Sequence, residues 1–222
     1  MLYIVATPIG NLEDITLRAL KVLRGADFIL VEDTRKAGLF VKALNLPKKH
    51  FLSFYEHNED QRIPQIISYL KQGKEIVLLS GAGTPLVSDP GFKLIQCCIK
   101  EDIAFTSVPG ASSVVNALVL SGCASDCFLF LGFLPRKKGK RLKKIASLKS
   151  FKCSLIIFES PFRIVKTLEE LERVLGNRRC ALCREMTKVY EEVVRGTLSE
   201  AKEALSKRKI KGECTLVLEG DK

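Results

Sequence analysis

The sequence predicts an α/β protein built from two domains. Short apolar segments that read as strands alternate with amphipathic segments that read as helices, the pattern of a mostly parallel sheet covered on both faces. The 222 residues, 46% of them hydrophobic, suffice for one large or two small domains with a sizeable core. A linker over 123–127 separates a regular half from a less regular one. We therefore expect domains at 1–122 and 123–222.

The first half contains five predicted strands, each followed by a loop and a helix. The strands are 2–6, 28–31, 51–54, 75–79 and 103–108. Helix ends are marked by ordinary stop signals, such as Gly25 after a leucine stripe and Gly73 after a helix over 60–72. The second half is predicted to hold strands 128–131, 154–158, 179–184, 190–198 and 214–218. Its helices are a basic one after residue 139, then 162–175 and 199–207.

The loop after strand 75–79 is the candidate cofactor site. It reads LLSGAGTPLVSDPG over 78–91, where glycine permits unusual backbone angles and close approach of a ligand. Asp89 is a natural N-cap for the next helix, with Pro90 at its first position. Open α/β sheets bind ligands at the carboxyl ends of their strands. By itself the loop would equally fit an ordinary strand–turn–helix corner.

Two common nucleotide-binding classes are excluded by motif. A Rossmann-type site needs several glycines directly after the first strand, where this chain has Thr7-Pro-Ile-Gly10. A nucleotide kinase needs a Gly-x-x-x-x-Gly-Lys-Ser/Thr run, which the sequence lacks.

Positive charge is concentrated in one stretch. The net charge is +11, and the segment 136–152 holds nine basic residues and no acidic one. Charge runs are often solvated helix faces, but so many like charges repel one another unless an anion binds there. The phosphate backbone of a nucleic acid is the favoured partner.

The eight cysteines are expected to be free thiols with an ordinary structural role. Cys180 and Cys183 have the spacing of zinc ligands, yet residues three apart in a strand point to opposite faces. Free cysteines behave as small buried hydrophobes in a reducing compartment. No basic leader precedes the first strand, and no apolar run reaches the roughly 18 residues of a membrane span. We expect no metal, no membrane and a cytoplasmic location.

Several motifs in a fixed order resemble one known family. They are 4–12 (IVATPIGNL), 31–35 (VEDTR), 57–59 (HNE), the 78–91 loop, 132–135 (GFLP), 159–163 (ESPFR), 184–188 (REMTK) and 211–213 (KGE). Together, over residues 3–219, the chain resembles the tetrapyrrole-methylase superfamily of S-adenosylmethionine enzymes. Within it, the chain is most similar to the branch that methylates small-subunit ribosomal RNA.

The resemblance implies two α/β domains of the tetrapyrrole methylase (class III methyltransferase) type, with S-adenosylmethionine in a cleft between them and held largely by backbone groups. By position, the implied cofactor-binding residues are Gly81, Gly83, Thr84, Pro85, Ser112, Phe158, Leu182 and Thr215. Phe158 and Leu182 would also serve as plain core residues. Where the branch usually has an aspartate, this chain has Gly81, so one carboxylate near the cofactor is missing.

Polar residues near the predicted strand ends supply the candidate chemistry. A ribose 2′-hydroxyl needs a hydrogen-bond acceptor, for which we favour Asp33 or Glu59, with Arg35 and Lys188 on phosphates. His57 completes the candidate catalytic set. The run 32–35 could instead cap the following helix, and His57 could be an ordinary surface or core residue.

The expected function is S-adenosylmethionine-dependent 2′-O-methylation of a cytidine in the 16S ribosomal RNA decoding centre, by a homodimer that acts on the RNA or the small subunit. The expected RNA-binding residues are Arg136, Lys137, Lys138, Lys140, Arg141, Lys143 and Lys144. Two alternatives remain open: a tetrapyrrole or other small-molecule methylase of the same fold, and a non-catalytic RNA-binding protein with a decayed cofactor site. Many members of the branch continue into an extra C-terminal domain, which this sequence is not expected to contain.

Overall fold

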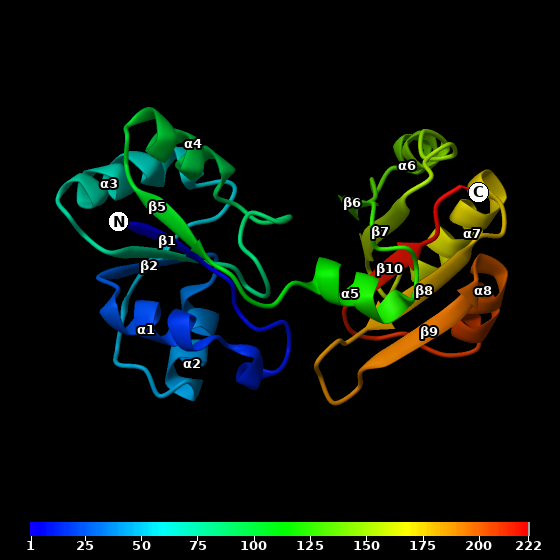
Figure 1. The fold of residues 1–222 in the computed structure, drawn as a ribbon, viewed down its shortest axis with the longest axis horizontal. Coiled ribbons are helices and arrows are strands. Elements are labelled where there is room, and N and C mark those ends of the chain that lie inside the picture. The colour runs from blue at the N-terminus through cyan, green and yellow to red at the C-terminus, as the bar shows by residue number, and fades with distance from the viewer. Residues whose placement is uncertain (222) are drawn as a thin grey trace. The chain divides into compact units, whose positions relative to one another are not determined.

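The computed structural model describes residues 1–221 and divides into two compact units, Met1–Ser112 and Ser113–Lys222 (Figure 1). The predicted boundary after residue 122 lies one helix further along the chain. The difference arises because α5 (Ser113–Ser121) packs against the sheet of the second unit.

The first unit is a parallel five-stranded sheet. Its strands are β1 (Leu2–Val5), β2 (Phe28–Val31), β3 (His50–Ser53), β4 (Ile76–Leu79) and β5 (Phe105–Val108), in the order β3-β2-β4-β1-β5. All four residues of β4 are buried and apolar, as expected for the middle strand of a sheet covered on both faces. All five carboxyl ends therefore meet at one edge.

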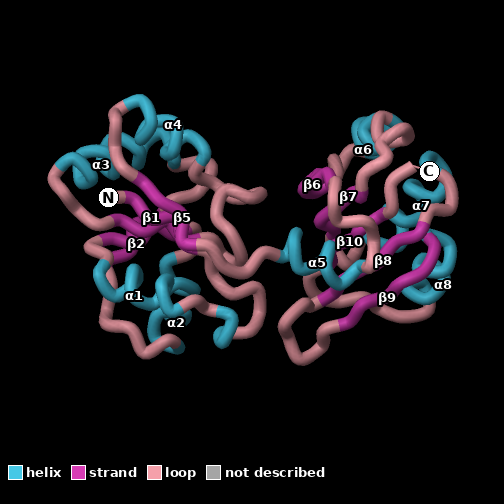
Figure 2. The backbone as a smooth tube through the Cα atoms, in the orientation of Figure 1, coloured by secondary structure: helices cyan, strands magenta, loops and turns pink. Residues whose placement is uncertain are grey.

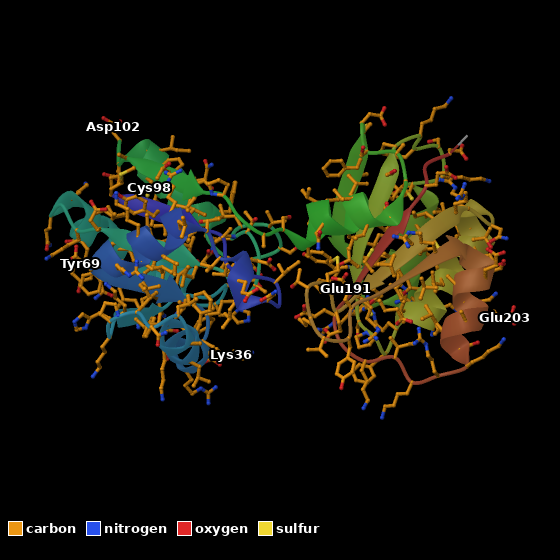
Figure 3. All side chains as sticks on the ribbon, turned by 60° about the horizontal axis from the view of Figure 1, so that its bottom comes forward. Lys36, Tyr69, Cys98, Asp102, Glu191 and Glu203 are labelled. Atoms are coloured by element: carbon orange, nitrogen blue, oxygen red, sulfur yellow. The ribbon has the colours of Figure 1, made fainter. Side chains whose placement is uncertain are left out.

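Two helix pairs cover this sheet, one on each face (Figures 1 and 2). After a short 3-10 turn at Leu12–Asp14, α1 (Leu17–Gly25) and α2 (Thr34–Ala43) pack on one face. The other face is covered by α3 (Glu59–Lys71) and α4 (Phe92–Lys100). Cys98, labelled in Figure 3, lies in this second core layer, where burial raises the pKa of its thiol to about 11.

The second unit, in which the predicted alternation of strands and helices is less regular, has a mixed sheet. Its strands are β6 (Phe128–Phe133), β7 (Ser154–Glu159), β8 (Arg179–Arg184), β9 (Glu192–Thr197) and β10 (Cys214–Leu218), in the order β6-β7-β10-β8-β9. Only β6 and β7 run parallel; the other three pairs are antiparallel. The reason is that β10, the last strand, inserts between β7 and β8 in the opposite direction.

Three helices, α6 (Lys138–Ala146), α7 (Ile164–Leu175) and α8 (Leu198–Ser206), share one core with this sheet. Helix α5 packs against β8 and β10, and the Cys183 thiol lies 3.7 Å from the Ala117 carbonyl. Across residues 1–221, none of the helices combines the length and the apolar character that a membrane crossing demands.

The cysteines of β8 lie in separate environments. Cys180 belongs to the core beneath α7 and α8, whereas Cys183 contacts α5. Burial raises the pKa of Cys180 to about 12 and that of Cys183 to about 11. Within the described residues no group of three or more His, Cys, Asp or Glu side chains could hold a metal ion.

Candidate active site

The parallel sheet of the first unit brings the predicted site residues of that unit to its carboxyl edge. Loops after four of the five strands contribute. These residues are Asp33 and Arg35 after β2, His57 and Glu59 after β3, Gly81, Gly83, Thr84 and Pro85 after β4, and Ser112 after β5.

The 78–91 loop is fastened to the loops after β1 and β5. Gly83 and Thr7 exchange two backbone hydrogen bonds, of 2.9 and 3.0 Å. Thr84 Oγ1 donates to the Ala111 carbonyl at 3.2 Å. Gly83 has a φ of +82°, and a Cβ there would lie 3.3 Å from the Ile9 side chain. The turn therefore requires glycine at position 83.

Gly81 is different from Gly83. It is exposed, its φ is outside the positive range, and a Cβ placed on it would meet nothing within 4 Å. Ala82 is held within the turn, because the Ser80 hydroxyl accepts from the Ala82 amide at 2.9 Å and donates to the Ala82 carbonyl at 2.8 Å. A side chain at position 81 would fit without strain.

The end of the loop departs from the predicted cap. The helix α4 begins at Phe92 with Gly91 as its N-cap, not at Pro90 with Asp89 as cap. Gly91 has a φ of +126°, and a Cβ there would lie 2.8 Å from Leu78. Its amide donates to Glu59 Oε1 at 2.6 Å. A carboxylate from α3 therefore holds the amide of the N-cap residue, and α4 has no side-chain cap of the kind predicted for Asp89.

The two favoured hydrogen-bond acceptors are both engaged with backbone. Glu59 is 5% exposed and holds the Gly91 amide. Asp33 caps α2, accepting from the Arg35 amide at 2.9 Å and from its guanidinium at 3.2 and 3.3 Å. Hydrogen bonding from Arg35 holds the pKa of Asp33 below its usual range. In the structure, these carboxylates organise the loops.

A cavity of about 360 Å³ lies at the same edge. Its lining residues are Glu32, Glu56, Glu59, Ser88, Asp89, Pro90, Gly91 and Phe92. Burial and the charge of Asp89 raise the pKa of Glu32, and burial raises that of Asp89 against a hydrogen bond from Ser80. Sequence reasoning chose neither as an acceptor. One signal was available, because both residues follow predicted strands of a parallel sheet, at the ends where such sheets bind ligands. That these two strands, β2 and β4, are neighbours is seen only in the structure.

His57 lies exposed in the turn after β3. Asn58 fixes this turn by accepting from the Tyr55 amide at 2.8 Å and donating to the Ser53 carbonyl at 3.1 Å. The His57 ring meets the Tyr55 ring edge-on at 6.5 Å.

In the second unit, Phe158 and Thr215 are paired across β7 and β10 and share one face of the sheet. Leu182 does not join them. It pairs with Leu216, the next residue along β10, so its side chain points to the opposite face and packs under α7 and α8. The Leu182 side chain is therefore a core residue, which is the alternative that the sequence left open for it.

The Lys188 ammonium forms salt bridges with two carboxylates of the protein. Its ammonium lies 3.0 Å from Glu185 Oε1 and 3.1 Å from Glu213 Oε2. Burial would lower its pKa, but these two hydrogen bonds raise it overall. The Glu185 carboxylate also accepts from the Glu213 amide at 2.9 Å, which joins the two motifs at 184–188 and 211–213. Lys188 thus bridges two loops.

The 159–163 motif holds the loop after β6. Glu159, 2% exposed, accepts from the Arg163 guanidinium at 2.8 and 2.9 Å and from the Thr167 hydroxyl at 2.7 Å. Arg163 in turn donates to the Leu134 carbonyl at 3.1 Å. The start of α7 is therefore tied to the end of β6.

Arg141 corrects the predicted RNA-binding set. It is 6% exposed and paired with buried Glu170 at 2.5 and 2.8 Å. It also donates to the carbonyls of Pro135 and Arg136. The hydrogen bond to Glu170 raises the pKa of Arg141, and its partner's pKa is lowered. Arg141 is a structural anchor of the loop, turned away from solvent.

The other six predicted residues form what we call the basic face: Arg136, Lys137, Lys138, Lys140, Lys143 and Lys144. All six are exposed, and none forms a salt bridge with any described residue. Other exposed lysines do, as at Lys71–Glu101 and Lys93–Asp60. Lys138 stands at the N-terminus of α6, where the helix dipole disfavours a cation. Helix stability alone does not account for these charges.

Comparisons with known proteins identify the family and the fold. The family model of Tetrapyrrole (Corrin/Porphyrin) Methylases matches residues 1–202, which places the chain in a class of methyltransferases. The uroporphyrin-III C-methyltransferase of Thermus thermophilus complexed with S-adenyl homocysteine has the same fold, with a TM-score of 0.64 at 19% identity over 98% of this chain and 96% of that one.

Two curated relatives are closer. Both are named ribosomal RNA small subunit methyltransferase I. The Thermotoga maritima protein is 45% identical over 99% of this chain and 98% of its own length. The Hydrogenobaculum sp. protein is 47% identical over 98% of this chain and 94% of its own length. The chain belongs to the tetrapyrrole methylase family and, within it, to the family of ribosomal RNA small subunit methyltransferase I.

Proposed function

We propose that this chain methylates the ribose 2′-oxygen of a cytidine in the decoding centre of 16S ribosomal RNA, with S-adenosylmethionine as methyl donor. The observation that carries the choice of substrate is the basic face. Six exposed cations without carboxylate partners suit a phosphate backbone, which a small-molecule methylase would not need. We further propose that the enzyme acts as a cytoplasmic homodimer.

The loop after β4 fits a cofactor that is held largely by backbone groups. Gly81 is exposed with open space around it, the Ser80 hydroxyl holds both main-chain groups of Ala82, and Gly83 turns the loop in a conformation that disfavours a side chain. When bound, S-adenosylmethionine supplies a methyl group on a positively charged sulfur. The protein's part is to align the ribose oxygen with that methyl group and to exclude water. Glu32, Glu56 and Asp89 are the cavity carboxyls that accept no backbone hydrogen bond in the described structure, and we propose that Glu32 and Asp89, whose pKa is raised, orient the hydroxyl.

The first test is calorimetric titration of the purified protein with S-adenosylmethionine. We expect one cofactor per chain. Labelled cofactor should then transfer methyl groups to small ribosomal subunits lacking this modification, at a cytidine 2′-oxygen. Cofactor binding without transfer to RNA or subunits would exclude the proposed substrate. RNA binding without any cofactor binding would indicate the decayed, non-catalytic alternative.

Replacing Gly81 by aspartate is expected to strengthen cofactor binding. The open space around position 81 admits the side chain, which restores the carboxylate usual in the resembled branch. One added hydrogen bond to a charged acceptor corresponds to roughly a tenfold lower Kd. Calorimetry measures the change directly.

The matched control is Gly83→Asp. Its φ of +82° and the nearby Ile9 side chain should make this substitution destabilising and harmful to cofactor binding. Weaker binding by a normally folded Gly81→Asp variant would contradict the assignment of this loop.

A further inference from the structure

Two phenylalanines at the end of β6 and the start of α7 are exposed without an evident structural need. Phe133 is 62% exposed and Phe162 is 87% exposed, whereas Phe54 in the first unit is 1% exposed. Side chains this exposed contribute little to the core. We propose that Phe133 and Phe162 form a platform on which unpaired bases of single-stranded RNA stack beside the basic face. This inference rests on the proposed function.

Each phenylalanine directly precedes one partner of a hydrogen bond that joins the loop after β6 to the start of α7. Phe133 directly precedes Leu134, and Phe162 directly precedes Arg163; the Leu134 carbonyl and the Arg163 guanidinium are joined by a 3.1 Å hydrogen bond. The Glu159 carboxylate accepts two further hydrogen bonds from the Arg163 guanidinium. Both phenylalanines are therefore carried by anchored backbone.

The Phe133 ring is also supported from one side. It lies 5.6 Å from the Phe158 ring, and Phe158 meets Phe130 edge-on at 4.8 Å. Phe158 is the predicted cofactor residue of this unit and pairs with Phe133 across β6 and β7. A base stacked on Phe133 would lie one strand from that residue, which suits a nucleotide next to the methylated one.

The surrounding charge favours RNA as the occupant. Arg136, Lys137 and Lys138 follow Phe133 along a loop whose carbonyls are held by Arg141, and they are exposed and unpaired. The first turn of α7, just after Phe162, contains no acidic residue. Aromatic rings beside unpaired cations are the usual means of binding single strands, because rings stack on bases while cations contact phosphates.

The same charge disfavours a second copy of the chain as the occupant. A two-fold interface places the same patch of both copies face to face. Here that would bring like-charged lysine and arginine groups together, which opposes association.

The test is binding of a fluorescently labelled, single-stranded RNA oligonucleotide, followed by anisotropy over a range of salt concentrations. We expect Phe133→Ala and Phe162→Ala each to weaken binding about tenfold, the scale of one lost base–aromatic stack. The slope of affinity against salt should stay unchanged, because a stack releases no counterions. Replacement of both residues by tyrosine should retain binding, and replacement of both by leucine should lose it.

The matched control is Phe128→Ala. Phe128 lies at the other end of β6 and is 42% exposed, so its removal tests general loss of a surface ring. Thermal unfolding of every variant checks that the fold is intact.

The outcomes separate the two proposals. Unchanged RNA affinity of both alanine variants, while charge reversal on the basic face weakens binding, would overturn the platform and leave the proposed function standing. A changed oligomeric state at unchanged RNA affinity would assign the rings to a protein interface and also overturn the platform. No RNA binding by the unmodified protein would overturn both.

Discussion

A variant with four charge reversals on the basic face is expected to bind RNA about 100-fold more weakly at ~0.1 M salt, because each lysine neutralises a phosphate and releases its counterion. The substitutions are Lys137→Glu, Lys138→Glu, Lys143→Glu and Lys144→Glu. The slope of log affinity against log salt should become shallower by about 4, one for each lost contact. Cofactor binding should be unchanged, since none of these residues lies in the loop after β4.

The control carries the same change of net charge on the first unit. Lys21, Lys42, Lys48 and Lys100 are exposed and form no salt bridge with a described residue, so their reversal alters the overall charge without touching the basic face. Equal loss of RNA affinity in both variants would mean that only net charge matters. Wild-type affinity in the first variant would refute the basic face as the RNA site.

Replacing Arg141 by methionine is expected to lower the free energy of unfolding by about 3–5 kcal/mol, because it leaves the Glu170 carboxylate buried without a partner. The Arg141 and Glu170 side chains are only 7% and 4% exposed. The double variant Arg141→Met, Glu170→Leu removes both charges and should recover most of the loss. Chemical denaturation followed by circular dichroism gives the free energies of unfolding of the unmodified protein, the single variant and the double variant.

The same pair predicts a dependence on pH. The folded-state pKa of Glu170 is lowered by Arg141. The folded protein then binds fewer protons than the unfolded chain, so this stabilisation is present above the unfolded glutamate pKa and is lost as the pH falls through the folded one. The double variant should lack this part of the acid sensitivity.

The exposed pair Lys207–Glu203 is the matched control for the buried one. Both side chains are 70% exposed, and Glu203→Gln should leave the free energy of unfolding nearly unchanged, because water screens an exposed ion pair. A similarly small effect of Arg141→Met would contradict the interpretation of Arg141 as a structural anchor.

Local sequence patterns located most of the elements. The apolar runs at β2, β8 and β10 gave the observed bounds, because short runs between turn signals leave little choice of ends. The turn at Gly83 could also be predicted, because glycine in a strand-to-helix loop indicates a backbone conformation that other residues rarely adopt.

Side-chain roles were harder, because the partners lie far apart in the sequence. Glu59 meets the Gly91 amide 32 residues away, and Arg141 meets Glu170 29 residues away. No local pattern reports that a particular carboxylate will approach a particular amide. For Arg141 one signal did exist: it shares a helical stripe with Ile145, and buried Leu148 follows, which marks the inner face of α6. Leu182 gives the corresponding example for a strand. Because side chains alternate along a strand, Leu182 and the next residue, Cys183, point to opposite faces.

The anchoring of the loop after β4 has a consequence for the entropy of ligand binding. Gly83 is fixed to Thr7, and the Ser80 hydroxyl holds the amide and the carbonyl of Ala82, so the turn at Gly81 and Ala82 is held before any ligand arrives. Ordering a mobile loop subtracts from affinity, since each residue that becomes fixed loses conformational freedom. This protein loses that freedom when it folds, so a ligand at Gly81 and Ala82 meets a surface that is already ordered.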